Sequence, residues 1–221
     1  MTTLFVTGTD TEIGKTHVAA HLLRAAADSG LRCAGYKPVA AGAEKTPEGW
    51  RNEDALALRA AGNVDLDYAL TNPYCLEPPI APHVAATEAG EVIEKAQLND
   101  CHDAIAAQSD FVLVEGAGGW RVPLGPDWDY ADWVSERGWP VLLVVGMRLG
   151  CINHALLSAE SIARRAPLLG WVANCLPPEQ PRLAENIETL VQRMPAPLLG
   201  VFPSDGSAPA NLNIKQVIAR T

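Results

Sequence analysis

Short apolar runs recur along the chain, and segments with helical spacing of apolar residues separate them. Most runs lack alternation between apolar and polar positions, which is typical of strands that are covered on both faces. The pattern predicts strands at residues 4–7, 32–36, 111–114, 141–145, 169–172 and 198–202. Because these strands alternate with helices, we expect a doubly wound α/β fold with a mostly parallel sheet and helices on both faces.

The predicted helix at residues 15–29 illustrates the helical pattern. It carries Val18 and Leu22 on one stripe and is followed by Gly30, a typical C-terminal stop. The same spacing predicts helices at residues 52–61, 89–107, 153–165 and 182–193. Glycine and proline predict loops at residues 42–49 and 71–82, and we expect a loop with one short helix at residues 204–221.

Composition narrows the class of protein. The chain has 221 residues, of which 48% are hydrophobic and 19% charged, so we expect one globular domain spanning residues 1–221. The net charge of −9 disfavours nucleic acid and anionic membranes as partners. Neither a leader peptide nor a membrane span is indicated, which predicts a cytoplasmic protein. The five cysteines are widely spaced, which favours reduced thiols over a disulfide framework.

The strongest chemical signal is the segment from Gly8 to Thr16, Gly-Thr-Asp-Thr-Glu-Ile-Gly-Lys-Thr, between the first strand and the first helix. Backbone N–H groups of such a loop surround phosphates, its lysine reaches the β- and γ-phosphates, and its hydroxyl binds Mg²⁺. Five residues separate Gly8 from Gly14, one more than in the standard P-loop. The segment predicts nucleotide binding within a fold like that of P-loop NTPases.

Two further strands deliver charged residues to the same edge of the sheet. Glu115 follows an apolar strand and precedes Gly116, Ala117 and Gly118, so that a carboxylate stands where a P-loop enzyme binds Mg²⁺. Lys37 ends another strand. A second cation near the γ-phosphate is useful because phosphoryl transfer depends on neutralising developing charge.

These elements, together with Asn52-Glu53-Asp54, closely resemble the dethiobiotin synthetases of biotin biosynthesis. The resemblance covers nearly the whole chain. The segments that carry it are residues 6–16, 35–39, 45–49, 72–74, 82–83, 112–120, 131–134, 149–154, 170–174 and 195–200. The long P-loop and the Gly-Cys-Ile-Asn-His run at residues 150–154 are specific to this family rather than generic.

The resemblance implies an ATP- and Mg²⁺-dependent ligase that acts on 7,8-diaminopelargonic acid and CO₂ or bicarbonate. One amine takes up CO₂ as a carbamate, which attacks the γ-phosphate of ATP. The second amine closes a cyclic urea on the resulting mixed anhydride, and ADP and phosphate leave. Cations and amide donors must stand between carbamate and triphosphate, because the two anions repel each other.

The resemblance also assigns roles to residues. Lys15, Lys37 and Glu12 would be catalytic, and Thr16, Asp54 and Glu115 would bind Mg²⁺. The substrate would contact Lys37 and a helix N-terminus at Gly150, Cys151, Ile152 and Asn153, supplied across the interface of a homodimer. The nucleotide would contact Glu12, Ile13, Gly14, Lys15, Thr16, His17, Asp54, Glu115, Gly116, Ala117, Gly118, Asn174 and Pro203, with the adenine at Asn174 and the loop from Pro203.

Two other classes share the P-loop core. A switch ATPase of the partitioning or cell-division-positioning kind carries a signature lysine early in the loop, where this chain has Asp10. A cobalamin-type synthetase linked to an amidotransferase needs a glutaminase domain in addition to these 221 residues. Both observations favour the ligase.

Overall fold

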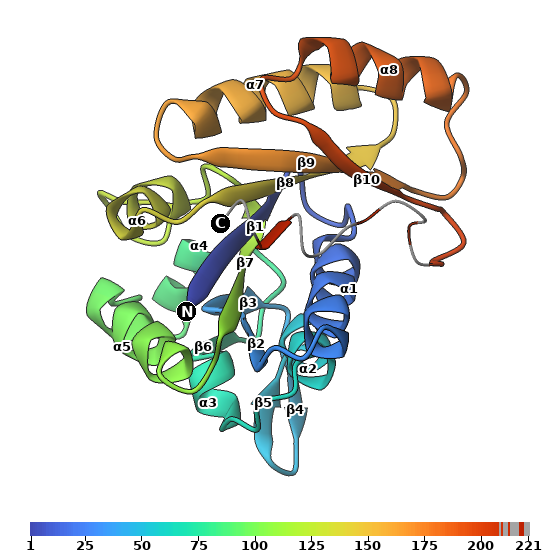
Figure 1. The fold of residues 1–221 in the computed structure, drawn as a ribbon. Helices are drawn as coiled ribbons and strands as arrows, with labels where there is room; N and C mark the ends of the chain where they lie inside the picture. The colour runs from blue at the N-terminus through green and yellow to red at the C-terminus, as the bar shows by residue number, and fades with distance from the viewer. Residues whose placement is uncertain (208, 210–211, 213–216, 219–221) are drawn as a thin grey trace.

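A six-stranded sheet lies at the centre of the protein in the computed structural model, which describes residues 1–207, 209, 212 and 217–218 (Figure 1). The strand order is β10-β9-β8-β1-β7-β2, and every neighbouring pair is parallel. The strands are β1 (Thr2–Gly8), β2 (Cys33–Tyr36), β7 (Phe111–Gly119), β8 (Val141–Met147), β9 (Leu168–Cys175) and β10 (Leu198–Phe202). The six strands expected from the sequence are confirmed.

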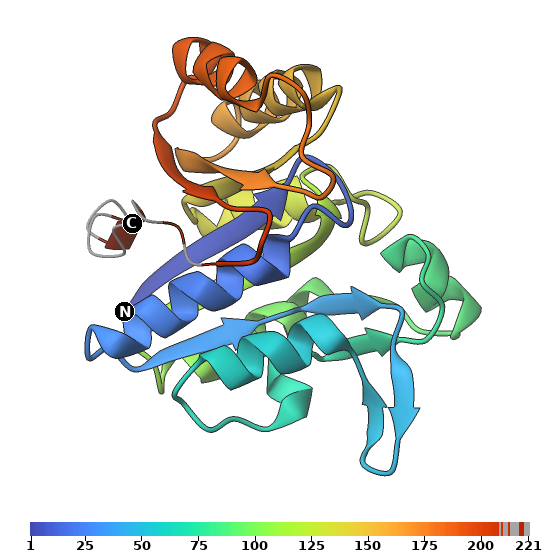
Figure 2. The ribbon, with the colours of Figure 1, turned by 90° about the vertical axis from the view of Figure 1, so that its right-hand side faces the viewer.

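Each face of the sheet carries its own hydrophobic core. Leu4 and Val6 of β1 pack with α1 (Lys15–Asp28) and α2 (Glu53–Ala61), which lie side by side in Figure 2. Phe5 points to the opposite face. That face is covered by α5 (Lys95–Ala106), α6 (Tyr130–Arg137), α7 (Cys151–Ala163) and α8 (Leu183–Arg193). Burial on both faces explains why β1 shows no polar alternation.

The chain between β2 and β7 contains more regular structure than its glycines and prolines indicate. β3 (Val39–Ala41) pairs with β6 (Tyr74–Leu76), and β4 (Glu44–Thr46) pairs with β5 (Gly49–Arg51) in a hairpin that projects from the body. The helices α3 (Tyr68–Thr71) and α4 (Pro82–Glu88) lie in the same region. The loop predictions for residues 42–49 and 71–82 are therefore partly wrong, because three-residue strands are too short to produce a recognisable period.

Two helix predictions also need correction. The helix expected at residues 89–107 begins only at Lys95, because α4 ends before it and Gly90 turns the chain with a φ of +69°. α6 is not among the helices predicted from the sequence, although Asp129 and Asp132 form a capping box at its start. Most of the segment expected at residues 204–221 lies outside the described residues, and the prediction of a single domain stays a prediction.

All five cysteines are free thiols, of which Cys33, Cys151 and Cys175 are buried. Within the described residues, no helix combines the length and the apolar character needed to cross a membrane.

Candidate active site

The P-loop connects the carboxyl end of β1 to α1 and has two residues in the left-handed region. Glu12 has a φ of +56°, and Gly14, the N-cap of α1, has a φ of +80°. A Cβ atom on Gly14 would lie 2.2 Å from Nδ2 of Asn174, which comes from the end of β9. This Nδ2 donates a hydrogen bond of 2.7 Å to the carbonyl oxygen of Ile13. Glycine at position 14 is therefore required by both the backbone conformation and this close approach.

The Lys15 ammonium lies inside the curve of the P-loop. Its Nζ donates a hydrogen bond of 2.9 Å to the carbonyl oxygen of Asp10, whose carboxylate is paired with Arg148. Burial and the nearby positive charge of Lys37 lower the pKa of Lys15 to about 8, although Glu115 and Asp54 oppose this shift. An anionic ligand would raise this pKa again, because an opposite charge favours the ammonium form.

Lys37 and Thr16 link two carboxylates. The Lys37 ammonium donates to Oδ2 of Asp54 at 2.9 Å and to Oε1 of Glu115 at 2.6 Å. The Thr16 hydroxyl lies 2.7 Å from Oδ1 of Asp54 and 2.9 Å from Oε1 of Glu115. Glu115 and Lys37 are buried, whereas Asp54 is partly exposed. Three elements, β7, α1 and α2, thus meet at one charged cluster beside the end of β2.

Electrostatics hold this cluster in its ionised form. Burial by itself lowers the pKa of Lys37, but Glu115 and Asp54 outweigh burial, so the pKa lies above its usual value. Burial raises the pKa of Asp54, and the charge of Lys37 with the hydrogen bonds from Lys37 and Thr16 produces a net lowering. The ammonium and the carboxylate therefore stabilise each other's charged states.

Three residues with no role assigned from the sequence, Asn52, Thr71 and Asn72, position this cluster. The Asn52 side chain caps α2 by accepting hydrogen bonds from the backbone N–H groups of Asp54 and Ala55. The Lys37 backbone donates to the Thr71 carbonyl at 2.8 Å and accepts from Nδ2 of Asn72 at 2.8 Å. Asparagine before an acidic helix start is a recognisable N-cap signal, whereas the contacts from residues 71 and 72 depend on tertiary packing.

A cavity of about 820 Å³ opens above the cluster, at the carboxyl edge of the sheet. Glu12, Gly14, Lys15, Thr16, Lys37, Asp54, Ala117 and Gly118 line it, so most of the expected phosphate and metal residues share one space. Its further walls include Ile80, Arg121 and Val122, none of which the sequence analysis selected. The volume lies within the range of small-molecule sites, about 300–1,000 Å³.

The cluster has the oxygen donors that Mg²⁺ prefers, namely a hydroxyl and two carboxylates. Oε2 of Glu115 is buried and has no hydrogen-bond partner among the described residues, so it keeps an unused acceptor. Thr16, Asp54 and Glu115 therefore fit a magnesium site that nucleotide phosphates would complete.

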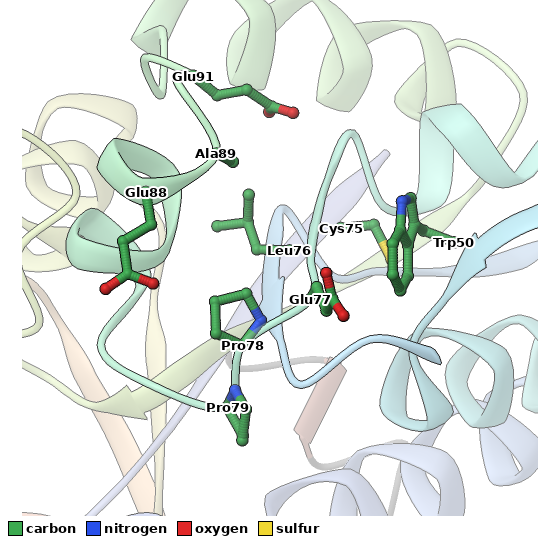
Figure 3. Close-up of a pocket in the computed structure, with 9 residues that line it drawn as sticks. All are labelled: Trp50, Cys75, Leu76, Glu77, Pro78, Pro79, Glu88, Ala89 and Glu91. Atoms are coloured by element: carbon green, nitrogen blue, oxygen red, sulfur yellow. The ribbon is translucent and has the colours of Figure 1, made fainter. Parts of the chain in front are cut away.

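A second cavity, of about 590 Å³, lies between β6 and α4 (Figure 3). Leu76 and Trp50 line it together with Glu77, Glu88 and Glu91. It shares Pro79 with the larger cavity and contains no residue expected to bind nucleotide or substrate.

Comparisons with known proteins identify the family. A family model described as an AAA domain matches residues 2–209. An ATP-dependent dethiobiotin synthetase BioD from Pseudomonas paraeruginosa is 55% identical over 205 residues, covering 92% of this chain and 90% of the relative. The chain belongs to the dethiobiotin synthetase family. The ATP-dependent dethiobiotin synthetase BioD 1 of Escherichia coli O157:H7 is 51% identical over 208 residues, covering 94% of this chain and 92% of the relative.

Solved structures support the fold of this dethiobiotin synthetase family member. The MinC:MinD cell division protein complex of Aquifex aeolicus matches with a TM-score of 0.58 and 19% identity, covering 100% of this chain and 95% of that chain. At this identity the likeness concerns the fold alone. The P-loop NTPase-like architecture is confirmed.

Several residues implied by the dethiobiotin synthetase resemblance lie apart from the cavity. His17 packs its ring against His21 and Phe202, and Ile13 is buried. Gly116 leaves room for Phe5, whose ring would lie 2.8 Å from an added Cβ. Pro203 follows β10, and Gly150, Cys151, Ile152 and Asn153 form the start of α7, none of them lining the cavity. Their roles in binding stay predictions, because the cavity itself does not include them.

Proposed function

We propose that the protein is an ATP- and Mg²⁺-dependent ligase that converts 7,8-diaminopelargonic acid and CO₂ to dethiobiotin, ADP and phosphate. The observation that carries this function is the identity of 51% and 55% to relatives with that activity in their names, over more than nine-tenths of the chain. The arrangement of Lys15, Lys37 and Asp54 around one cavity supports it, with Glu115 buried against Lys37.

The reaction joins two anions before it closes a ring. A carbamate oxygen forms a bond to the γ-phosphorus of ATP while the bond to ADP breaks, and the second amine then displaces phosphate from the carbonyl carbon. We propose that Lys15 and Lys37 neutralise the phosphoryl group during transfer and that Glu12 orients the reactants from the P-loop. Positively charged groups held in advance contribute most of the acceleration in such transfers.

The nucleotide site in this proposal uses the backbone more than side chains. The N–H groups of residues 12–17 would surround the phosphates, and Ala117 and Gly118 would lie against the nucleotide. Thr16, Asp54 and Glu115 would hold Mg²⁺, whose positive charge would neutralise negative charge on the phosphate oxygens. For the adenine we propose Asn174 and the segment from Pro203, because Asn174 already contacts the P-loop at Ile13.

We also propose a homodimer in which α7 meets a second copy. Leu149, directly before α7, is 98% exposed, and Leu157 on the same helix is 59% exposed. Burying such side chains is favourable. The start of α7 would then bind the carboxylate of the substrate held in the partner subunit's cavity, through the backbone N–H groups of Gly150, Cys151, Ile152 and Asn153. Sedimentation equilibrium is expected to give a dimer, with Leu149→Asp shifting it toward monomer. A monomeric wild type at assay concentrations would contradict the arrangement.

A switch ATPase is the alternative function. Switch ATPases have a signature lysine at the position of Asp10 in this chain. Asp10 is negatively charged and forms an ion pair with Arg148, so it cannot do the work of that lysine. The ligase is therefore the better supported function. A cytoplasmic location belongs to the same proposal, because ATP and bicarbonate are available there, and cell fractionation tests it.

The deciding experiment measures phosphate release from Mg²⁺-ATP by the purified protein, with and without 7,8-diaminopelargonic acid and bicarbonate. Release that needs both co-substrates and matches dethiobiotin one for one, with the product detected by mass, is expected. Release that is indifferent to the diamine and yields no new product would instead favour the switch ATPase.

A further inference from the structure

The carboxylates of Asp54 and Glu115 already hold one cation, the Lys37 ammonium. Its Nζ lies 2.9 Å from Asp54 and 2.6 Å from Glu115, and the side chain is only 3% exposed. Mg²⁺ binds carboxylate oxygens at about 2.0–2.1 Å, closer than a hydrogen bond. A divalent ion between the same oxygens would therefore press against the ammonium.

We propose that the Lys37 ammonium and a divalent cation occupy the carboxylates of Asp54 and Glu115 alternately. The ammonium holds them in the free protein, and the cation binds them only when it enters together with the triphosphate. The proposal rests on the proposed function, because it takes Thr16, Asp54 and Glu115 as the metal site. It assigns Lys37 a role in addition to charge neutralisation, namely control over when the metal site accepts a metal.

The balance of charge supports this order of entry. Two carboxylates, Asp54 and Glu115, face two ammonium groups, Lys15 and Lys37, which interact electrostatically with both acids. The cluster is therefore close to neutral and attracts a lone dication weakly. A triphosphate adds about four negative charges at neutral pH, more than either lysine can neutralise, so metal and ammonium are then both favoured.

The anchoring of Lys37 allows the required movement. Hydrogen bonds to the Thr71 carbonyl and from the Asn72 side chain hold its backbone, whereas its four-carbon stem is flexible and lines the cavity where the phosphates would lie. Oε2 of Glu115, buried without a partner in the described part of the chain, is available to a metal ion once the ammonium has left Oε1. The ammonium can therefore exchange carboxylates for phosphate without rebuilding the site.

Titration with Mn²⁺ in place of Mg²⁺, followed by electron paramagnetic resonance without nucleotide, tests the proposal. The wild type is expected to bind Mn²⁺ weakly alone and tightly with a non-hydrolysable ATP analogue. Lys37→Met should strengthen nucleotide-free binding by at least about tenfold, because a unit charge a few ångströms from a dication has a larger effect even at a dielectric constant of ~20.

Two further variants make the result specific. Lys45→Met removes the same charge from the exposed hairpin strand β4 and should leave Mn²⁺ binding unchanged. Adding Glu115→Gln to Lys37→Met should abolish the gain. If Lys37→Met does not fold, Lys37→Gln replaces it, because glutamine keeps a hydrogen-bond donor without the charge.

Two outcomes would overturn the proposal. One is a folded Lys37 variant that binds Mn²⁺ without nucleotide no better than the wild type does. The other is a wild type that binds Mn²⁺ as tightly without the ATP analogue as with it. Dethiobiotin formation by the wild type is measured separately. If the wild type forms no dethiobiotin while Lys37→Met still binds Mn²⁺ more tightly, the proposed ligase reaction is refuted. If the wild type forms dethiobiotin but Lys37→Met does not bind Mn²⁺ more tightly, the proposed exchange of Lys37 for metal is refuted.

Discussion

Replacing Lys37 by glutamine is expected to lower the turnover number by about two to three orders of magnitude. This is the typical cost of removing one preorganised group that stabilises the charge of a transition state. The affinity for ATP should fall much less. The reason is that Lys15 and the P-loop amides remain, and the ground-state triphosphate is held mainly by them. Single-turnover measurements of product formation, together with calorimetric titration of ATP, separate the two effects.

Lys45→Gln is the matched control for this prediction, since Lys45 is exposed on the hairpin. It should leave both turnover and ATP affinity close to those of the wild type. Turnover near the wild-type value in Lys37→Gln would show that Lys37 has no catalytic role, even if the cavity does bind ATP.

Gly14→Ala is expected to weaken ATP binding by about a hundredfold. Alanine at a left-handed φ costs about 1–2 kcal/mol, and loss of the contact between Asn174 and Ile13 costs about 1 kcal/mol more. The free protein can relieve this strain by moving the loop, so the full cost is incurred when the amides must realign around phosphates. Calorimetric titration with ATP measures the loss.

Gly30→Ala isolates the backbone contribution. Gly30 follows α1 with a φ of +91°, and a Cβ there would meet no atom within 4 Å. This variant should be less stable to heat than the wild type yet bind ATP normally. Equal ATP affinity in Gly14→Ala and the wild type would mean that the close approach of Asn174 does not shape the loop.

The central sheet was predictable because its strands are buried on both faces and read as continuous apolar runs. β4 and β5 were not, since three residues are too few for a periodic signal. The helix expected at residues 89–107 shows a different weakness. The spacing of apolar residues gives no sign of a break, and only the structure shows that α4 ends before the left-handed turn at Gly90 and that α5 begins at Lys95.

The residues of the candidate site also differ in whether the sequence alone could predict them. Lys15 and Thr16 belong to a local motif, and the edge rule for parallel strands places Lys37 and Glu115 beside them. The hydrogen bond from Asn174 to Ile13 joins residues far apart in sequence, so no local pattern contains it. The same holds for Asn72, whose contact with the Lys37 carbonyl depends on how α3 packs. The assigned roles stay predictions that the variants above test.

The position of β1 has a consequence for how the protein is made. β1 lies between β7 and β8, so both of its hydrogen-bonding edges need partners that the ribosome adds more than a hundred residues later. Pairing between distant segments is slow because a long loop must close first. During translation we therefore expect the P-loop sequence to emerge early but to be held in place only after Asn174, which contacts it from β9, has left the exit tunnel. Until then the apolar residues of β1 are available to chaperones, and the capacity to bind nucleotide arrives late in synthesis.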